Sequence, residues 1–182
     1  SRHEAMHAGP DAPTNSMHLR GLLASALGIE ETLEALVMTW VAPIAQLLFP
    51  DHIEGAITEQ HSYIVRYGDA HDHDLGFHVD DSEVTLNLCL SRSGEGSELY
   101  FEGLRCALHA NGPSRPAERF DWQHTPGVAV LHAGKNRHGV RPISGGTRRT
   151  LIVWMRDGGG AERWETHRAR AICPSWCDHP GS

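Results

Sequence analysis

The sequence predicts an α+β protein in which helices near the N-terminus support a β-sandwich or barrel. Two observations carry this prediction. Apolar residues recur every three or four positions before Gln60, which is the helical period, and they alternate with polar residues in several segments after it, as in half-buried strands. Helices followed by short strands are typical of α+β domains. At 182 residues and 40% hydrophobic content, the chain suits one domain with a sizeable core.

Four segments are expected along this domain. Residues 1–15 contain glycine and proline without a periodic apolar pattern, so we interpret them as a flexible leader. Residues 16–60 are the helical support, with a short apolar stripe that ends at Leu27 and a longer one that Pro43 is expected to divide into two helices. Residues 61–157 are the strand-rich core, and residues 158–182 are a tail with at most one short helix.

The expected strands cover residues 62–67, 83–90, 98–102, 127–132 and 149–155. The second of them alternates strictly. Val84, Leu86 and Leu88 lie on one face, whereas the opposite face carries Thr85 and Asn87. That opposite face is polar enough to line a functional site.

Charge, cysteine content and hydropathy exclude several classes of protein. The net charge is −7, and the 15 arginines and one lysine form no basic run, so nucleic acid is not expected as a partner. Four cysteines are too few for a disulfide framework, which weakly favours a reducing, cytoplasmic location and leaves the compartment open. No apolar stretch reaches about 18 residues, so no membrane span is expected.

His78 and Asp80 are candidate metal ligands. Two residues apart on an extended segment, they point to the same side. Two imidazoles and one carboxylate can hold one face of a ferrous ion and leave three positions open. His138, after the strand at 127–132, is a candidate third ligand, but spacing alone does not separate it from its competitors, which are His132, His71 and His73.

Arg148 is a candidate for binding a carboxylate group. It stands at the start of an apolar strand, where its guanidinium can form a bidentate pair with an anion in the cavity. Arg149 is the rival, but alternation along a strand puts the two side chains on opposite faces. A solvent-facing salt bridge is the expectation for Arg149.

Several motifs occur together in one order. They are residues 74–88 around His78 and Asp80, Leu99-Tyr100-Phe101, residues 129–134, His138 to Pro142, and Gly146-Thr147-Arg148. In this order and spacing they resemble the 2-oxoglutarate/iron oxygenases of the prolyl and lysyl hydroxylase type, and most of all the PKHD-type hydroxylases. The resemblance covers about residues 60–157. It implies a double-stranded β-helix (jelly-roll) core.

The resemblance also implies a cofactor and a reaction. Fe(II) would be the metal, 2-oxoglutarate and dioxygen the co-substrates, and no catalytic residue would be needed beyond the metal centre. Decarboxylation of 2-oxoglutarate would be coupled to hydroxylation of an aliphatic C–H bond, most simply in a prolyl or lysyl side chain of a protein or peptide. The implied roles are iron ligation by His78, Asp80 and His138, binding of the 2-oxoglutarate C5 carboxylate by Arg148, and further co-substrate contacts by Tyr67 and Asn87.

Two other functions stay open at this stage. One is an inactive jelly-roll scaffold or sensor that binds metal. The other is a cupin-type, non-oxidative metalloenzyme, which would need the three metal ligands but not Arg148. Related folds also act on small molecules, so the substrate is not chosen by the fold.

The tail and one long loop add two further expectations. Cys173, Cys177 and His179 could belong to a zinc site, but their spacing is unusual and a fourth ligand is missing. Docking of the tail by Trp164 and Trp176 is the favoured interpretation. The loop at 103–121 is long enough for a lid over the substrate pocket, and a passive surface loop is the equal alternative.

Overall fold

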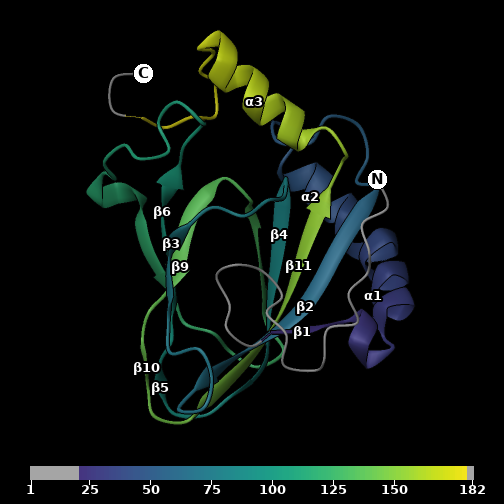
Figure 1. Ribbon diagram of the computed structural model, residues 1–182, viewed down its shortest axis with the longest axis vertical. Helices are drawn as coiled ribbons and strands as arrows, with labels where there is room; N and C mark the ends of the chain where they lie inside the picture. Colours follow the sequence, from purple (N-terminus) through teal and green to yellow (C-terminus); the bar gives the residue numbers. More distant parts are fainter. Residues whose placement is uncertain (1–20, 180–182) are drawn as a thin grey trace.

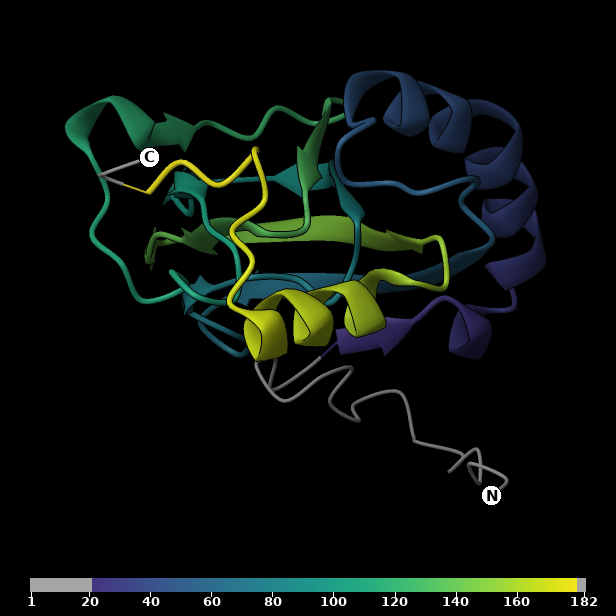
Figure 2. The ribbon, with the colours of Figure 1, turned by 90° about the horizontal axis from the view of Figure 1, so that it is seen from above.

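The computed structural model describes residues 21–179, and its strands form two facing sheets (Figures 1 and 2). The large sheet has the order β1-β2-β11-β4-β8 and the small sheet the order β3-β9-β6-β7, while β10 and β5 form a separate pair. All pairs of named strands are antiparallel. The bounds are β1 Gly21–Leu23, β2 Glu59–Gly68, β3 Leu75–His78, β4 Val84–Arg92, β5 Glu95–Gly96, β6 Leu99–Leu104, β7 Arg119–Trp122, β8 Ala129–Ala133, β9 Asn136–Val140, β10 Ile143–Ser144 and β11 Thr147–Arg156.

The five strands expected from the sequence correspond to β2, β4, β6, β8 and β11, and the predicted α+β class is confirmed. The sequence pattern missed β3 and β9, which lie side by side in the small sheet. β9 reads Asn-Arg-His-Gly-Val, so it lacks the alternation of apolar residues that identifies a strand. Its polar side chains are nevertheless mostly buried, because His138 faces the space between the sheets and the loop after β6 covers Arg137.

The N-terminal helical segment lies against the outer face of the large sheet (Figure 1). It consists of α1 (Glu30–Leu36), a π-helical turn η2 (Val37–Val41) and α2 (Ala42–Leu48). The expected division at Pro43 is therefore wrong, because the segment continues through this position. Pro43 has no N–H to donate, and its place in the first turn of α2, directly after the wide π turn, avoids the loss of a helical hydrogen bond.

The expectation of a helix just before this segment also needs correction. Gly21–Leu23 form β1, which pairs with β2 along the edge of the large sheet, and Ser25–Leu27 form a single 3-10 turn, η1. Pairing with an existing strand satisfies backbone groups that a helix of this length leaves unpaired. The expected leader at 1–15 and the start of the first apolar stripe lie outside the described residues.

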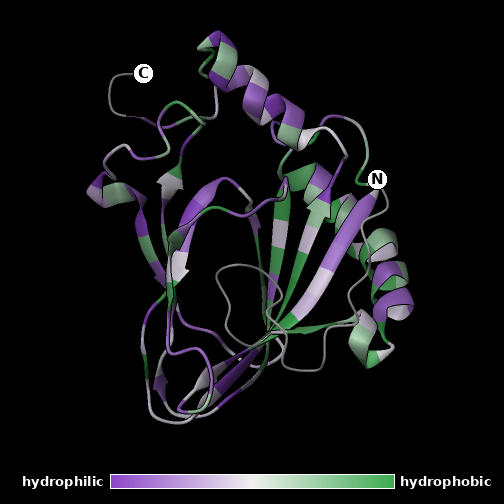
Figure 3. Cartoon of the chain, in the orientation of Figure 1, coloured by the Kyte–Doolittle hydropathy of each residue, from purple (hydrophilic) through white to green (hydrophobic). Residues whose placement is uncertain are grey.

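The apolar core has two layers. One cluster fills the space between the helical segment and the large sheet, and the other lies between the two sheets. β11 serves both, because Val153 and Met155 face the helices while Ile152 faces the small sheet. Figure 3 shows the corresponding apolar colouring along β4 and β11. The helical stripe is only partly buried, since the side chain of Trp40 is 69% exposed.

The tail docks on the remainder of the chain, as the favoured interpretation expected. Helix α3 (Gly160–Arg170) follows β11, and the Lys135 ammonium lies 5.0 Å from the centre of the Trp164 ring. Further along, the rings of His52 and Trp176 lie 4.8 Å apart. A short 3-10 helix, η3 (Pro116–Glu118), interrupts the loop between β6 and β7. Among the described residues, no helix is long and apolar enough to cross a membrane.

Candidate metal centre

The pairing of β3 with β9 brings the candidate metal ligands together. His78 ends β3 and lies directly opposite His138 in β9, while Asp80 follows two residues after His78. His78 Nε2 is 3.4 Å from Asp80 Oδ1, and His138 Nε2 is 3.5 Å from Asp80 Oδ2. The three residues can offer ligand atoms that all lie within 4.8 Å of one another. They therefore form a group able to hold one metal ion.

Backbone carbonyl groups orient both imidazoles. His78 Nδ1 lies 2.8 Å from the carbonyl oxygen of Gly76, and His138 Nδ1 lies 2.8 Å from that of Asn136. Because a carbonyl oxygen only accepts, each Nδ1–H is the donor and each Nε2 keeps a free lone pair. These lone pairs lie beside Asp80, which is the arrangement of metal-ligating histidines held by second partners.

The protonation states also suit a divalent metal. Burial opposes ionisation of Asp80, but the neighbouring histidines, with His138 first, outweigh it and hold the pKa of this carboxyl group well below its usual value. Burial lowers the pKa of His138 to about 3, so this imidazole is neutral at pH 7. An ionised carboxylate and neutral imidazoles are the donors that Fe(II) requires.

The competing residues lie outside this group. His132 is buried near Asp80, but its Nε2 is 4.0 Å from the carboxylate and its ring packs edge-on against His138. His71 and His73 lie in the loop before β3 and are not members of the group. Asp81 turns away from the site, as its position one residue out of phase suggests, and pairs with Arg156 at the surface.

A cavity between the two sheets opens beside these ligands. Its polar wall includes Tyr67, Thr85 and Asn87, and its apolar wall includes Leu99 and Ile152. Thr85 and Asn87 come from the strand face that the sequence identified as polar. The Thr85 hydroxyl donates a hydrogen bond of 2.6 Å to Asp80 Oδ2, whereas Asn87 Oδ1 has no hydrogen-bond partner among residues 21–179.

Arg148 is fully buried on the inner face of β11, close to this cavity. Its guanidinium lies over the ring of Tyr67, a cavity residue, at 4.5 Å. Neither Nε nor Nη1 of Arg148 has a hydrogen-bond partner within residues 21–179. Leaving buried charged donors unpaired is costly, so the arrangement suits a bound anion. Arg149 is exposed on the opposite face, in agreement with the alternation along the strand.

The structure adds two residues that the sequence did not place at the site. Lys135 donates a hydrogen bond of 3.0 Å to the carbonyl oxygen of Asp80. His124 is buried without a partner for either ring nitrogen among residues 21–179, and burial together with the charges of Arg148 and Arg92 lowers its pKa to about 3. His124 comes from the loop before β8, where no pattern in the sequence distinguishes it from other histidines.

Comparisons with known proteins agree with this geometry. The chain is 46% identical over 142 residues to the 2-oxoglutarate and iron-dependent oxygenase domain-containing protein ICU11 of Arabidopsis thaliana, an alignment that covers 78% of this chain and 36% of that protein. It is 39% identical to the similarly named protein CP2 of the same plant, with 90% of this chain and 41% of that protein covered. The chain thus spans less than half the length of these relatives. No family model matches it.

A solved structure supports the fold. The crystal structure of an oxidoreductase of the 2OG-Fe(II) oxygenase family from Burkholderia pseudomallei has a TM-score of 0.52 and 20% sequence identity, and the match covers 70% of this chain and 55% of that one. At this identity the likeness concerns the fold alone. It confirms the double-stranded β-helix expected from the sequence.

Proposed function

Since the chain is homologous to the 2-oxoglutarate and iron-dependent oxygenase domain-containing proteins, we propose that it is an Fe(II)- and 2-oxoglutarate-dependent oxygenase that hydroxylates an aliphatic C–H bond. One observation carries the proposal. The group formed by His78, Asp80 and His138 lies in the same inter-sheet space as a buried arginine with unpaired donors. A metal centre alone would not need Arg148. A dicarboxylate that chelates the metal needs both the metal-binding group and a cation such as Arg148 for its second carboxylate.

In this proposal His78, Asp80 and His138 would hold Fe(II), the metal that two imidazoles and one carboxylate suit. The bound iron supplies the activation of dioxygen that is coupled to decarboxylation of 2-oxoglutarate. The protein fixes the directions of the ligands. The carbonyl groups of Gly76 and Asn136 set the two imidazole rings, and the Thr85 hydroxyl sets the Asp80 carboxylate.

Arg148 binds the C5 carboxylate of 2-oxoglutarate in this proposal. Its unpaired buried donors favour an anionic partner, and a hydrogen bond from a guanidinium to a carboxylate is among the strongest in proteins. The Tyr67 ring packs against the guanidinium of Arg148. Burial raises the pKa of the Tyr67 phenol, so this hydroxyl stays neutral and can donate a hydrogen bond. Asn87 adds a polar contact from β4. The apolar wall of Leu99 and Ile152 limits access of water to the co-substrate.

The proposed substrate is a prolyl or lysyl side chain in a protein or peptide. This narrower statement is supported by the resemblance of residues 60–157 to prolyl and lysyl hydroxylases. Small-molecule substrates are the alternative that a substrate screen distinguishes.

Succinate formation tests the proposal. The protein is loaded with Fe(II), supplied with 2-oxoglutarate and dioxygen, and incubated with proline- and lysine-containing peptides or with free amino acids. We expect succinate release and addition of one oxygen atom to a peptide, with both lost in Asp80→Ala. His73→Ala is the matched control, because this histidine lies outside the ligand group. Folded, iron-loaded protein that forms no succinate with any substrate would contradict the proposal and favour the scaffold or cupin-type alternatives.

A further inference from the structure

A second group of potential metal ligands lies away from the candidate iron centre. Cys106, His109, Cys173 and Cys177 can offer ligand atoms that all lie within 4.8 Å of one another. The first two residues belong to the loop after β6, and the other two to the tail after α3. These segments are far apart in the sequence but lie side by side at the same end of the molecule (Figure 1).

The distances within this group match tetrahedral zinc. His109 Nδ1 lies 3.4 Å from Cys106 Sγ, 3.6 Å from Cys177 Sγ and 3.8 Å from Cys173 Sγ. With Zn–S bonds of about 2.3 Å and Zn–N bonds of about 2.0 Å, tetrahedral angles place sulfur and nitrogen about 3.5 Å apart. The cysteines are free thiols and do not form disulfides within residues 21–179.

Two tight turns present these ligands in pairs. The His109 N–H donates to the Cys106 carbonyl oxygen, and the Cys177 N–H donates to the carbonyl oxygen of Pro174. The Cys106 N–H donates a hydrogen bond of 3.3 Å to Cys177 Sγ across the two segments. A backbone donor aimed at a cysteine sulfur stabilises the thiolate form, which is the form that binds metal.

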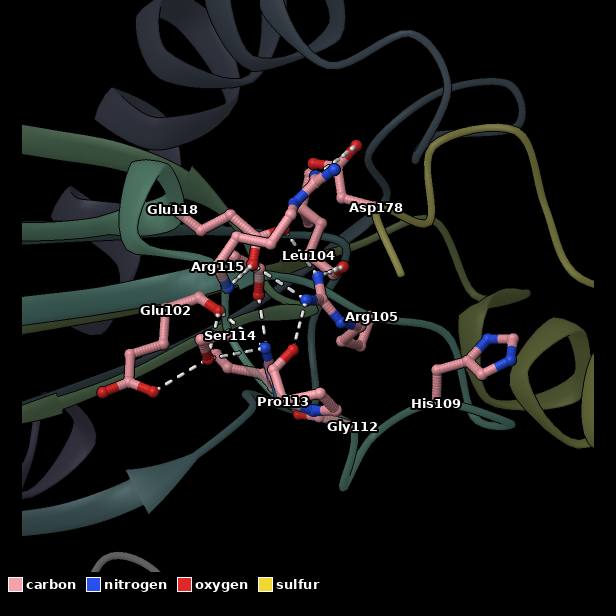
Figure 4. Close-up of polar contacts among 12 residues, drawn as sticks. Glu102, Leu104, Arg105, His109, Gly112, Pro113, Ser114, Arg115, Glu118 and Asp178 are labelled. Carbon is pink, nitrogen blue, oxygen red and sulfur yellow. Dashed lines mark hydrogen bonds and ion pairs between the residues drawn. The ribbon is translucent and has the colours of Figure 1, made fainter. Parts of the chain in front are cut away.

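The surrounding charge suits a site rich in thiolates. A zinc ion with three thiolates and one neutral imidazole carries a net charge of −1. Two buried guanidinium groups, those of Arg105 and Arg137, lie close enough to interact with the charge of Cys177. Arg105 pairs with Glu118 (Figure 4), but Arg137 binds only carbonyl and hydroxyl oxygens among the described residues. One positive charge is therefore left to balance the site.

We propose that Cys106, His109, Cys173 and Cys177 bind a structural zinc ion that fastens the C-terminal tail to the loop after β6. Four protein ligands close the coordination sphere, which is the pattern of structural rather than catalytic zinc. The sequence suggested His179 as a third ligand and offered no fourth. In the structure, the ring of His179 stacks on that of His109 at 3.8 Å and an angle of 5°, so it packs against a ligand.

Metal analysis of the purified, reduced protein tests this proposal. We expect about one equivalent of tightly bound zinc in the wild type, and its loss in Cys173→Ser and Cys177→Ser. Two controls should keep it, namely Cys89→Ser, which alters a buried cysteine of β4 outside the group, and His179→Ala. Replacement of zinc by Co(II) should give an intense thiolate-to-metal charge-transfer band. The candidate iron centre has no thiolate, so metal bound there does not produce this band.

A measurement on the wild type alone guards against misfolded variants. Alkylation of the native protein, counted by mass spectrometry, should leave Cys106, Cys173 and Cys177 unmodified until a strong chelator removes the metal. Cys173 is the sharpest reporter, because its side chain is exposed and only a bound metal would protect it. Alkylation of Cys173 at the same rate with and without the chelator would overturn the proposal. So would zinc-free protein in which these cysteines form disulfides, or a charge-transfer band that persists in Cys177→Ser.

Discussion

Asp80 is the residue on which the candidate iron centre depends most. Its two carboxylate oxygens face different imidazoles, and the Thr85 hydroxyl holds one of those oxygens through a hydrogen bond of 2.6 Å. The carboxylate therefore cannot rotate freely. Thr85 is not a member of the ligand group, so its role is to position Asp80.

Thr85→Val tests this role. Valine has nearly the same shape but cannot donate the hydrogen bond, so we expect metal affinity to fall by about 10–100-fold, as is usual for partners of metal ligands. Titration with Co(II) or Mn(II) measures the change, with Thr125→Val, an exposed threonine, as the control. An unchanged affinity in folded Thr85→Val would show that the hydroxyl does not orient Asp80.

At the scale of elements, the alignment of β3 with β9 sets the geometry of the ligands. Gly139 follows His138, and a Cβ atom at this position would meet the Tyr100 hydroxyl and lie 2.6 Å from the carbonyl oxygen of Leu75. Both neighbouring strands thus approach β9 more closely than a side chain permits. Close packing of this kind fixes the place of His138.

Gly139→Ala should displace β9, lower the melting temperature and weaken metal binding together. Gly76→Ala is the matched control on the paired strand, because a Cβ atom there meets nothing within 4 Å. Thermal unfolding with and without Co(II) measures both effects. If Gly139→Ala retains the metal affinity of the wild type, strand alignment does not control the site.

The segment between β6 and β7 depends on a buried ion pair. Arg105 is fully buried and binds Glu118 through both Nη atoms, whereas Arg115 binds the same carboxylate from the surface (Figure 4). Removing a buried partner leaves an uncompensated charge, so Arg105→Ala should lower the free energy of unfolding by about 3–5 kcal/mol. Arg115→Ala should cost less than about 1 kcal/mol. Urea denaturation distinguishes them, and equal effects would contradict this assignment.

The same pair predicts a dependence on pH. Burial opposes ionisation of Glu118, but the hydrogen bonds from Arg105 and Arg115 outweigh it and lower the pKa from 4.5 to about 2. A lowered carboxyl pKa stabilises the fold above the unfolded value and loses that effect as the pH falls toward the folded value. Between pH 4.5 and 2, stability should therefore fall less steeply in Glu118→Gln than in the wild type. Parallel curves would contradict this prediction.

Local patterns in the sequence predicted some elements and not others. The alternation along β4 identified the strand and the face with Thr85 and Asn87, because its apolar face packs against the helical segment while its polar face lines the cavity. β9 shows no such alternation, because its polar side chains are buried by contacts with other segments of the folded chain. The proposed zinc ligands could not be predicted from local sequence patterns either. Cys106 and Cys177 are 71 residues apart, so only the folded chain reveals that they meet.

At the scale of the whole molecule, both apolar layers stabilise the fold, but only the layer between the sheets borders the candidate metal centre. The layer between the helices and the large sheet contains Met155, while the layer between the sheets contains Ile152, which also lines the cavity beside the metal ligands. Both side chains come from β11 and point to opposite faces. Their truncation therefore compares the two layers within one strand.

Met155→Ala and Ile152→Ala should each lower the free energy of unfolding by about 2–5 kcal/mol, as expected for large buried side chains. Only Ile152→Ala should also weaken 2-oxoglutarate binding, because it enlarges and wets the cavity. Chemical denaturation and co-substrate titration measure the two effects. Equal losses of co-substrate affinity would show that the layers are not independent.

Anaerobic titration of the Fe(II)-loaded protein with 2-oxoglutarate tests the central claim most directly. The claim is that His78, Asp80 and His138 hold iron while Arg148 holds the co-substrate. The wild type and Arg149→Ala should develop the weak visible band of 2-oxoglutarate bound to Fe(II), and Asp80→Ala should not. Arg148→Ala should need at least about 30-fold more co-substrate, corresponding to about 2 kcal/mol for a lost buried charge pair. Absence of the band in folded, iron-loaded wild type, or an unchanged titration in Arg148→Ala, would contradict the claim.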